Sequence, residues 1–316
     1  SIFILIAIIA LYLSAKNPDS TEQQLIHTFN ILHLSDPNNF ITGSLLHPDS
    51  IATLGIYSAR SWVFLLLFVG FAIKLPMVPF HTWLPDAHVE APTAISVILA
   101  ALLLKIGGYG LARLAFPVFP DAVVEFSWFM GFMGLLSIIY GALNALASKD
   151  LKRLIAYSSV SHMGFVLLGF ASGTTEGISG AVYQMVSHGI ISAMLFLLAG
   201  VLYDRTSDRQ IENYSGLSSK MPAYGAFVLI AFFASMGLPG FSGFIAEIMI
   251  LLGAFKSQSA NQLIPSWMAI VATSGLILGA AYYLWTIQRM FFGKFSVKIS
   301  DAKLPDLDQR EYIMLL

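Results

Sequence analysis

Apolar residues lie in long uninterrupted runs along this 316-residue chain, and short polar stretches separate the runs. A helix that crosses a lipid bilayer needs about 20 consecutive, mainly apolar residues. Runs of this kind predict membrane helices near residues 1–15, 61–89, 92–116, 121–147, 152–172, 177–203, 222–256 and 265–292, with a further helix from about 312. We therefore expect an all-α protein that crosses the membrane many times.

Two of the predicted helices contain a break, near residues 74–79 (KLPMVP) and 237–243 (GLPGFSG). Proline removes a backbone donor and clashes with the preceding turn, and glycine loosens a helix. In a membrane such breaks are tolerated only where protein or water satisfies the freed backbone groups. We expect two discontinuous helices, and since transporters with inverted repeats place their sites at such helices, the pair suggests an internal duplication.

The order of runs predicts five regions. They are a truncated helix at 1–15, an extramembrane loop at 16–59, the end of a first repeat at 61–116, a second repeat at 121–292, and a link with the start of a last helix at 293–316. Because Ser1 lies inside one apolar run and the final EYIMLL opens another, the chain is expected to be a fragment cut through a helix at each end.

Basic residues are unevenly divided between the two sides of the predicted membrane. If successive helices alternate, one side holds Lys16, Arg60, Arg113 and Lys256. The other side holds Lys149, Lys152, Arg153, Arg205, Arg209, Lys220, Arg289, Lys294, Lys298, Lys303 and Arg310. The richer side is expected to be cytoplasmic or its topological equivalent.

The composition indicates a membrane protein and excludes several classes of function. The chain is 57% hydrophobic and 11% charged with a mean hydropathy of +0.75, as in polytopic membrane proteins. A net charge of −1 offers no basic surface for nucleic acid, and without cysteine the chain supplies no disulfide and no thiolate ligand. No dinucleotide-binding or Walker-type glycine motif appears, and the spacing of Asp86, His88 and Glu90 does not favour a metal site.

Five ionisable residues fall within or beside the apolar runs: Lys74, Lys105, His162, His188 and Glu247. A charge at mid-bilayer depth costs about 2.5–3.5 kcal/mol, and such residues usually mark ion or proton routes. The set predicts a proton relay. Structural readings stay open beside it, because Lys74 can snorkel to the interface, Glu247 can satisfy the broken backbone, and either histidine can be a hydrogen-bonded packing residue.

Three motifs in order, FAIKLPMVPFHTWLPDAHVEAPTAISVILAALLLK, DLKRLIAYSSVSHMGF and GLPGFSGFIAE, resemble the antiporter-like proton-pumping subunits of respiratory complex I. These are related to subunits of Mrp-type sodium/proton antiporters and of membrane-bound hydrogenases. The resemblance implies a fourteen-helix protein with two inverted five-helix repeats, of which this chain holds helices six to thirteen and the start of fourteen. Glu247 stands where L- and N-type subunits carry lysine, which points to the M type, the relative of mitochondrial subunit four.

The resemblance also implies roles. Lys74 is the proton-loading lysine, tuned by a helix-five glutamate that would precede Ser1; Lys105 links the half-channels. His162 and His188 are relay members, and Glu247 is the exit-side group. NADH, FMN, iron–sulfur clusters and quinone are expected in partner subunits, with none of them bound by this chain. Neighbouring L- and N-type subunits and the lipid of a prokaryotic inner membrane are the expected partners.

Three other functions remain open. The chain can belong to an Mrp-type antiporter driven by an ion gradient, or to the pump of a membrane-bound hydrogenase. It can also be a structural membrane spacer, which predicts that Lys105→Ala is tolerated. The sequence leaves open the quinone type, the electron donor, the pumping stoichiometry, the organism, and whether Na⁺ replaces H⁺.

Overall fold

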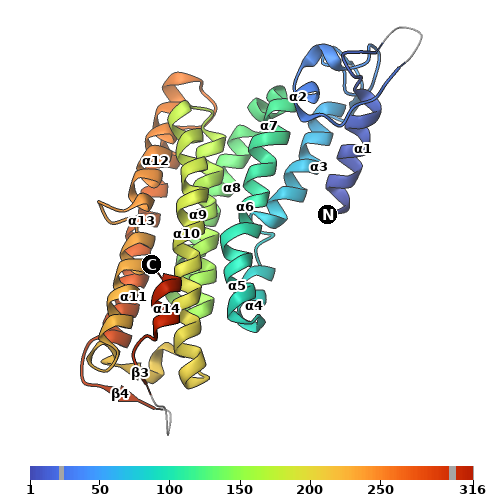
Figure 1. Cartoon of the computed structure of the whole chain (residues 1–316). Coiled ribbons are helices and arrows are strands. Elements are labelled where there is room, and N and C mark those ends of the chain that lie inside the picture. The colour runs from blue at the N-terminus through green and yellow to red at the C-terminus, as the bar shows by residue number, and fades with distance from the viewer. Residues whose placement is uncertain (21–24, 299–303, 316) are drawn as a thin grey trace. The chain divides into compact units, whose positions relative to one another are not determined.

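The computed structural model describes residues 1–20, 25–298 and 304–315, and it confirms an all-α architecture (Figure 1). The chain divides into two compact units: Ser1–Leu75 with Ile106–Ser127, and Pro76–Lys105 with Trp128–Leu316. Five helices in the described residues have the length and composition to cross a membrane. They are Thr93–Val118, Pro120–Ala147, Leu151–Ala171, Thr175–Thr206 and Ser266–Phe291, each within a few residues of its predicted run.

In the first unit, α1 (Ile2–Ser14) packs against α3 (Ala59–Lys74). Helix α3 begins where the Ser58 side chain accepts a hydrogen bond from the Ser61 amide, a standard N-cap. In the described part of the polar segment before it, residues 16–20 and 25–58, the elements are short. These are α2 (Ile31–Leu34), a 3₁₀ turn (Pro37–Asn39), β1 (Thr53–Leu54) and β2 (Tyr57–Ser58).

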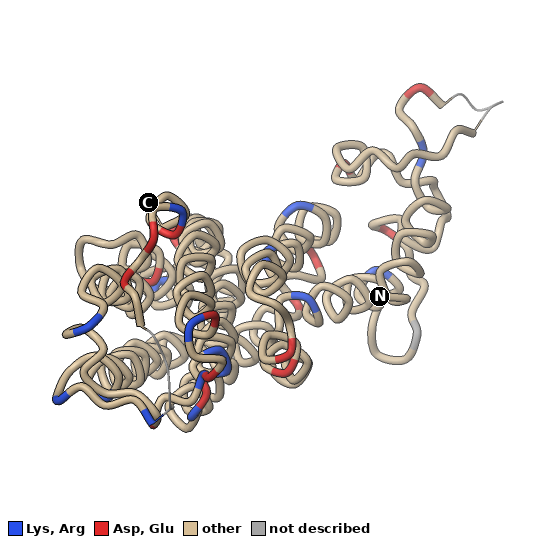
Figure 2. Tube along the Cα trace, turned by 60° about the horizontal axis from the view of Figure 1, so that its bottom comes forward, with Lys and Arg blue, Asp and Glu red and all other residues tan. Residues whose placement is uncertain are grey.

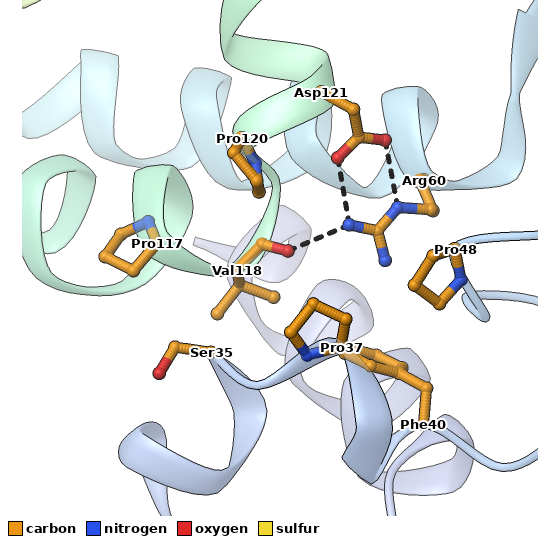
Figure 3. Close-up of a pocket in the computed structure, with 9 residues that line it drawn as sticks. All are labelled: Ser35, Pro37, Phe40, Pro48, Arg60, Pro117, Val118, Pro120 and Asp121. Atoms are coloured by element: carbon orange, nitrogen blue, oxygen red, sulfur yellow. Dashed lines mark hydrogen bonds and ion pairs between the residues drawn. The ribbon is translucent and has the colours of Figure 1, made fainter.

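A buried arginine ties this polar segment to the helix ends (Figure 3). The Arg60 guanidinium makes a bidentate pair with Asp121, with both N···O distances 2.9 Å. It also donates to the carbonyls of Leu46 and Val118, at 2.8 and 3.0 Å. A pocket of ≈ 250 Å³ lies beside the pair, and four of its nine lining residues are prolines. Because a buried guanidinium needs partners for its donors, these four bonds fix the loop against the two helices.

The second unit is a helical bundle around α9 (Leu151–Ala171), nearly every residue of which is buried. Helix α9 packs against α10 (Thr175–Thr206), α12 (Ser242–Ala260) and α4 (Trp83–Glu90). This unit also contains α5 (Thr93–Ile98), a π-turn (Leu99–Leu103), the later part of α8 (Pro120–Ala147), α11 (Pro222–Ser235), α13 (Ser266–Phe291), α14 (Gln309–Leu315), the 3₁₀ turns Ile211–Asn213 and Leu217–Ser219, β3 (Tyr214–Ser215) and β4 (Ser296–Val297).

Glycine contacts bring these helices close together. A Cβ on Gly134 of α8 would lie 2.9 Å from the Gly164 carbonyl oxygen of α9, and a Cβ on Gly164 would lie 2.7 Å from that of Gly134. Gly253 of α12 meets the backbone of Gly177 of α10 in the same way. Small residues allow such close approach of two helix backbones in membranes.

Both predicted helix breaks are present, and a neighbouring helix satisfies the backbone at each. Between α3 and α4, the Val78 amide donates to the buried Ser137 hydroxyl of α8 at 3.0 Å. Between α11 and α12, Gly237 and Gly240 adopt positive φ angles of 70° and 106°. There the carbonyl of Ser235 accepts a hydrogen bond from His162, as described below.

Charged residues of the second unit gather at the helix ends and connections (Figure 2). At one end, Glu212 lies 3.7 Å from Lys149 and 3.8 Å from Arg289, and Arg209 pairs with Asp150 at 3.2 Å. Across the bundle, the α10 start and the α12 end are joined by a 2.6 Å pair between Glu176 and Lys256. The alternating topology assigned Lys149, Arg209 and Arg289 to one side of the membrane and Lys256 to the other. The structure places the first three at one end of the second unit and Lys256 at a different end.

Candidate functional site

Lys105 follows a π-helical turn, Leu99–Leu103, within the helix Thr93–Val118. In a regular α-helix the Leu104 amide would bond the Ala100 carbonyl. Here it bonds the carbonyls of Leu99 and Leu102, and Ala100 accepts from the Lys105 ammonium at 2.5 Å. The turn therefore supplies a backbone ligand for a lysine within a membrane-length helix, in keeping with the occurrence of π-turns at functional sites.

His188 makes the second contact with the Lys105 ammonium. Its Nδ1 lies 2.7 Å from the Lys105 ammonium, and its side chain is 4% exposed. An ammonium only donates, so Nδ1 accepts and the neutral ring carries its proton on Nε2. The next residue of α10 is Gly189, where a Cβ would lie 3.1 Å from the Ala101 carbonyl oxygen. Glycine thus lets α10 approach the lysine-bearing helix.

His162 of α9 lies next in the series. The centroid of its ring is 5.2 Å from that of the His188 ring, and 6% of its surface is exposed. Its Nε2 is 3.0 Å from the carbonyl oxygen of Ser235, the last residue of α11. A carbonyl only accepts, so Nε2 carries the proton of this ring and Nδ1 holds a lone pair. His162 thereby satisfies the backbone at the second break.

Glu247 of α12 ends the series. One carboxylate oxygen lies 3.6 Å from His162 Nε2, and the residue is 3% exposed. Gly237 lies directly against the other oxygen, and a Cβ at that position would collide with it. The broken segment therefore makes room for the carboxylate. Four of the five predicted residues, from four different helices, form one series, in which His162, His188 and Glu247 are buried and Lys105 is half-buried.

The fifth, Lys74, belongs to the first unit. It is the last residue of α3, its side chain is exposed, and it makes no ion pair among the residues that the structure describes. The acidic and imidazole groups after it have structural partners. Asp86 pairs with Arg153 at 2.9 Å, and the buried His88 stacks on Phe196 with centroids 4.2 Å apart.

Gln184 was missed by the sequence analysis. It lies one turn before His188 on α10, is 2% exposed, and its Oε1 has no hydrogen-bond partner in the described part of the chain. With His162, His188 and Ser235 it lines a cavity of ≈ 10 Å³. The signal was its i, i+4 spacing from His188, which places both on one helix face.

A series of hydrogen-bonded hydroxyl groups that begins at Ser235 was also not predicted from the sequence. Ser235 Oγ lies 2.6 Å from the Tyr283 hydroxyl, which donates to Ser158 Oγ at 3.0 Å. All three side chains are buried. These hydrogen bonds hold Ser235 in place, and the Ser235 carbonyl orients His162. The three hydroxyl groups come from α9, α11 and α13, so no local spacing in the sequence predicts that they meet.

The series is suited to proton transfer. Amine, imidazole and carboxylate groups all exchange protons, and here they lie one after another within the second unit. Among the described residues, no three His, Asp or Glu side chains cluster as metal ligands. The geometry therefore supports acid–base chemistry along a path.

Comparison with known proteins places this arrangement in a family. Residues 1–277 match the family described as NADH:quinone oxidoreductase/Mrp antiporter, transmembrane. Subunit M of the NADH-quinone oxidoreductase of Rhodobacter capsulatus is 43% identical over 98% of this chain and 56% of its own length. NADH-ubiquinone oxidoreductase chain 4 of Chondrus crispus is 47% identical over 82% of this chain and 52% of its own.

Solved structures show the same fold. A chain of respiratory complex I from Thermus thermophilus is 35% identical, with a TM-score of 0.79 over 99% of this chain and 59% of that one. A chain of the Mrp complex of a Dietzia species shares the fold alone, at 23% identity and a TM-score of 0.77 over 96% of this chain and 50% of that one. This chain spans about half the length of the curated relatives it matches, and it belongs to the NADH:quinone oxidoreductase/Mrp antiporter transmembrane family.

Proposed function

We propose that this chain is part of an M-type membrane-arm subunit of a proton-translocating NADH:quinone oxidoreductase, respiratory complex I. The observation that carries the proposal is the series of the half-buried Lys105 with the buried His188, His162 and Glu247, joined by contacts of 2.7 Å at one end and 3.6 Å at the other. Relatives 43–47% identical are named as subunit M or chain 4 of that enzyme.

The donor directions of the series support transfer from Lys105 to Glu247. The ammonium points a proton at His188 Nδ1, and His188 carries its own proton on Nε2. His162 carries its proton on Nε2, the nitrogen nearest to Glu247. A proton entering at Lys105 can therefore move along the series by successive transfers between neighbouring groups. We propose Lys74, the last residue of α3, as the proton-loading lysine of the subunit.

Electron transfer from NADH to quinone belongs to partner subunits in this proposal. The chain has no cysteine to hold an iron–sulfur cluster, and its amine, imidazole and carboxylate groups exchange protons rather than electrons. We propose L- and N-type subunits as neighbours in the membrane arm. The bacterial relatives support a plasma-membrane location, with the basic end of the second unit on the cytoplasmic side.

An Mrp-type sodium/proton antiporter is the second candidate, because its subunits share the fold. The same four side chains would then carry protons in exchange for Na⁺, driven by an ion gradient and without electron transfer. The higher identity to named complex I subunits, together with glutamate at position 247, favours the redox-driven pump.

Lys105→Ala in the full-length subunit of the assembled complex tests the proposal. We expect NADH-driven proton pumping in membrane vesicles to be lost and NADH oxidation to slow, because the first donor of the series is removed. Lys149→Ala is the matched control, since that lysine is exposed at a helix end and 3.7 Å from Glu212. Parental pumping by the Lys105 variant would refute the relay.

A further inference from the structure

The two histidines at the centre of the series present complementary nitrogens. His188 carries a proton on Nε2 because Nδ1 accepts from Lys105, and His162 has a free lone pair on Nδ1 because Nε2 donates to Ser235. The rings are inclined at 58° with centroids 5.2 Å apart. A proton donor on one ring and an acceptor on the other thus lie at the middle of the path.

A cavity lies beside these rings. It offers ≈ 10 Å³ to the centre of a water molecule and is lined by His162, Gln184, His188, Ile191, Ala234, Ser235 and Gly243. About 10–15 Å³ on this measure accommodates one water, provided that two to four polar groups can bond it. Two atoms of lining residues, Gln184 Oε1 and His162 Nδ1, are buried and have no partner in the described residues.

A buried amide oxygen without a hydrogen bond is destabilising, and native proteins rarely leave one unmatched. Gln184 is 2% exposed and lies on α10 one turn from His188, on the same helix face. One water in the cavity would satisfy Gln184 Oε1 and His162 Nδ1 together. A leucine of similar size would fill the same volume without this unsatisfied oxygen, so volume alone does not explain a glutamine here.

We propose that Gln184 holds a single water that carries the proton from His188 to His162. This inference rests on the proposed function, and Gln184 is a positioning residue within it. His188 Nε2–H gives its proton to the water oxygen while the water gives one of its protons to His162 Nδ1, and the water is regenerated. His188 gains the Lys105 proton on Nδ1, His162 releases its Nε2 proton to Glu247, and the net change is a neutral Lys105 and a protonated Glu247.

Two substitutions separate water binding from packing. Gln184→Leu keeps the side-chain volume and removes the polar group, whereas Gln184→Ala opens space in which a second water can replace the amide. We expect NADH-driven proton pumping per assembled complex to fall about tenfold in the leucine variant, the rate effect of one lost hydrogen bond, and to stay within about twofold of the parent in the alanine variant. Gln288→Leu, on the exposed face of α13, is the matched control and should pump as the parent does.

A packing role predicts the reverse order, with alanine the more harmful change because it leaves a cavity. Equal effects or the reversed order would overturn the proposal. Lys105→Ala, measured in parallel, distinguishes a failure of the proposed water site from a failure of the proposed relay. If it abolishes pumping while Gln184→Leu pumps normally, the water site is wrong and the relay stands; if it pumps normally, the relay itself is wrong.

Electron cryomicroscopy of the assembled parent complex gives a second test that does not depend on the variants. We expect density for an ordered water about 3 Å from Gln184 Oε1, between the two imidazole rings. A map that shows other buried waters and none at this position would overturn the proposal.

Discussion

Individual residues of the site were predictable where their chemistry conflicted with their surroundings. Lys105, His188 and Glu247 stand out because a charge inside an apolar run is costly and needs a reason. Gln184 and Ser235 carry no such signal, since uncharged polar residues are common in membrane helices. Their importance depends on which helix faces which, and that arises only from packing in the folded bundle.

Gly237 shows how a residue with no side chain shapes the site. Its φ angle is 70°, and a Cβ there would collide with the Glu247 carboxylate. We expect Gly237→Ala to displace Glu247 from His162 and to lower NADH-driven proton pumping about tenfold, as expected for one weakened transfer step. The measurement is pumping per assembled complex.

Gly55→Ala is the matched control for that prediction. Gly55 also has a φ angle of 70°, but it is exposed, and a Cβ there would have no neighbour within 4 Å. Both alanines carry the same backbone strain of about 1 kcal/mol. Equal pumping by the two variants would show that contact with Glu247 is unimportant.

Among the elements, the broken helices were the most predictable, because proline and glycine act through the backbone wherever they occur. The sequence did not reveal how the freed groups are satisfied. Ser137 of α8 accepts from the Val78 amide, and His162 of α9 donates to the Ser235 carbonyl. The π-turn before Lys105 was likewise unforeseen, since the residues Leu99–Leu103 are ordinary helix formers.

The first break yields a stability prediction. Ser137→Ala leaves the Val78 amide without its acceptor, which we expect to cost about 1–3 kcal/mol, the range for a buried unsatisfied backbone group. The purified complex should then lose activity at a lower temperature in a thermal inactivation series. Ser274→Ala is the control, because among the described residues that half-buried side chain bonds only the Val271 carbonyl of its own helix. Identical inactivation curves for the two variants would mean that Ser137 does not stabilise the break.

Across the whole molecule, the division of charge carries the most information. The alternating topology placed residues 149–153 and 205–220 on one side of the membrane and Lys256 on the other. In the second unit, the contacts of Asp150 with Arg209 and of Glu176 with Lys256 join helix ends in that same grouping. The side that each end faces depends on the membrane and its insertion machinery, which the fold of an isolated chain does not contain.

Site-directed labelling of introduced cysteines determines that orientation, and these 316 residues contain no cysteine that would compete for the label. Ser219 is exposed in the connection before α11, and Ser259 is exposed near the end of α12. We expect a membrane-impermeant maleimide to label Ser219→Cys only from the cytoplasmic face, in inverted vesicles. Ser259→Cys should be labelled only from the opposite face, in intact spheroplasts. Because α11 and α12 together cross the bilayer once through their break, labelling of both sites from one face would contradict the topology, and exchanged faces would contradict the orientation inferred from the basic residues.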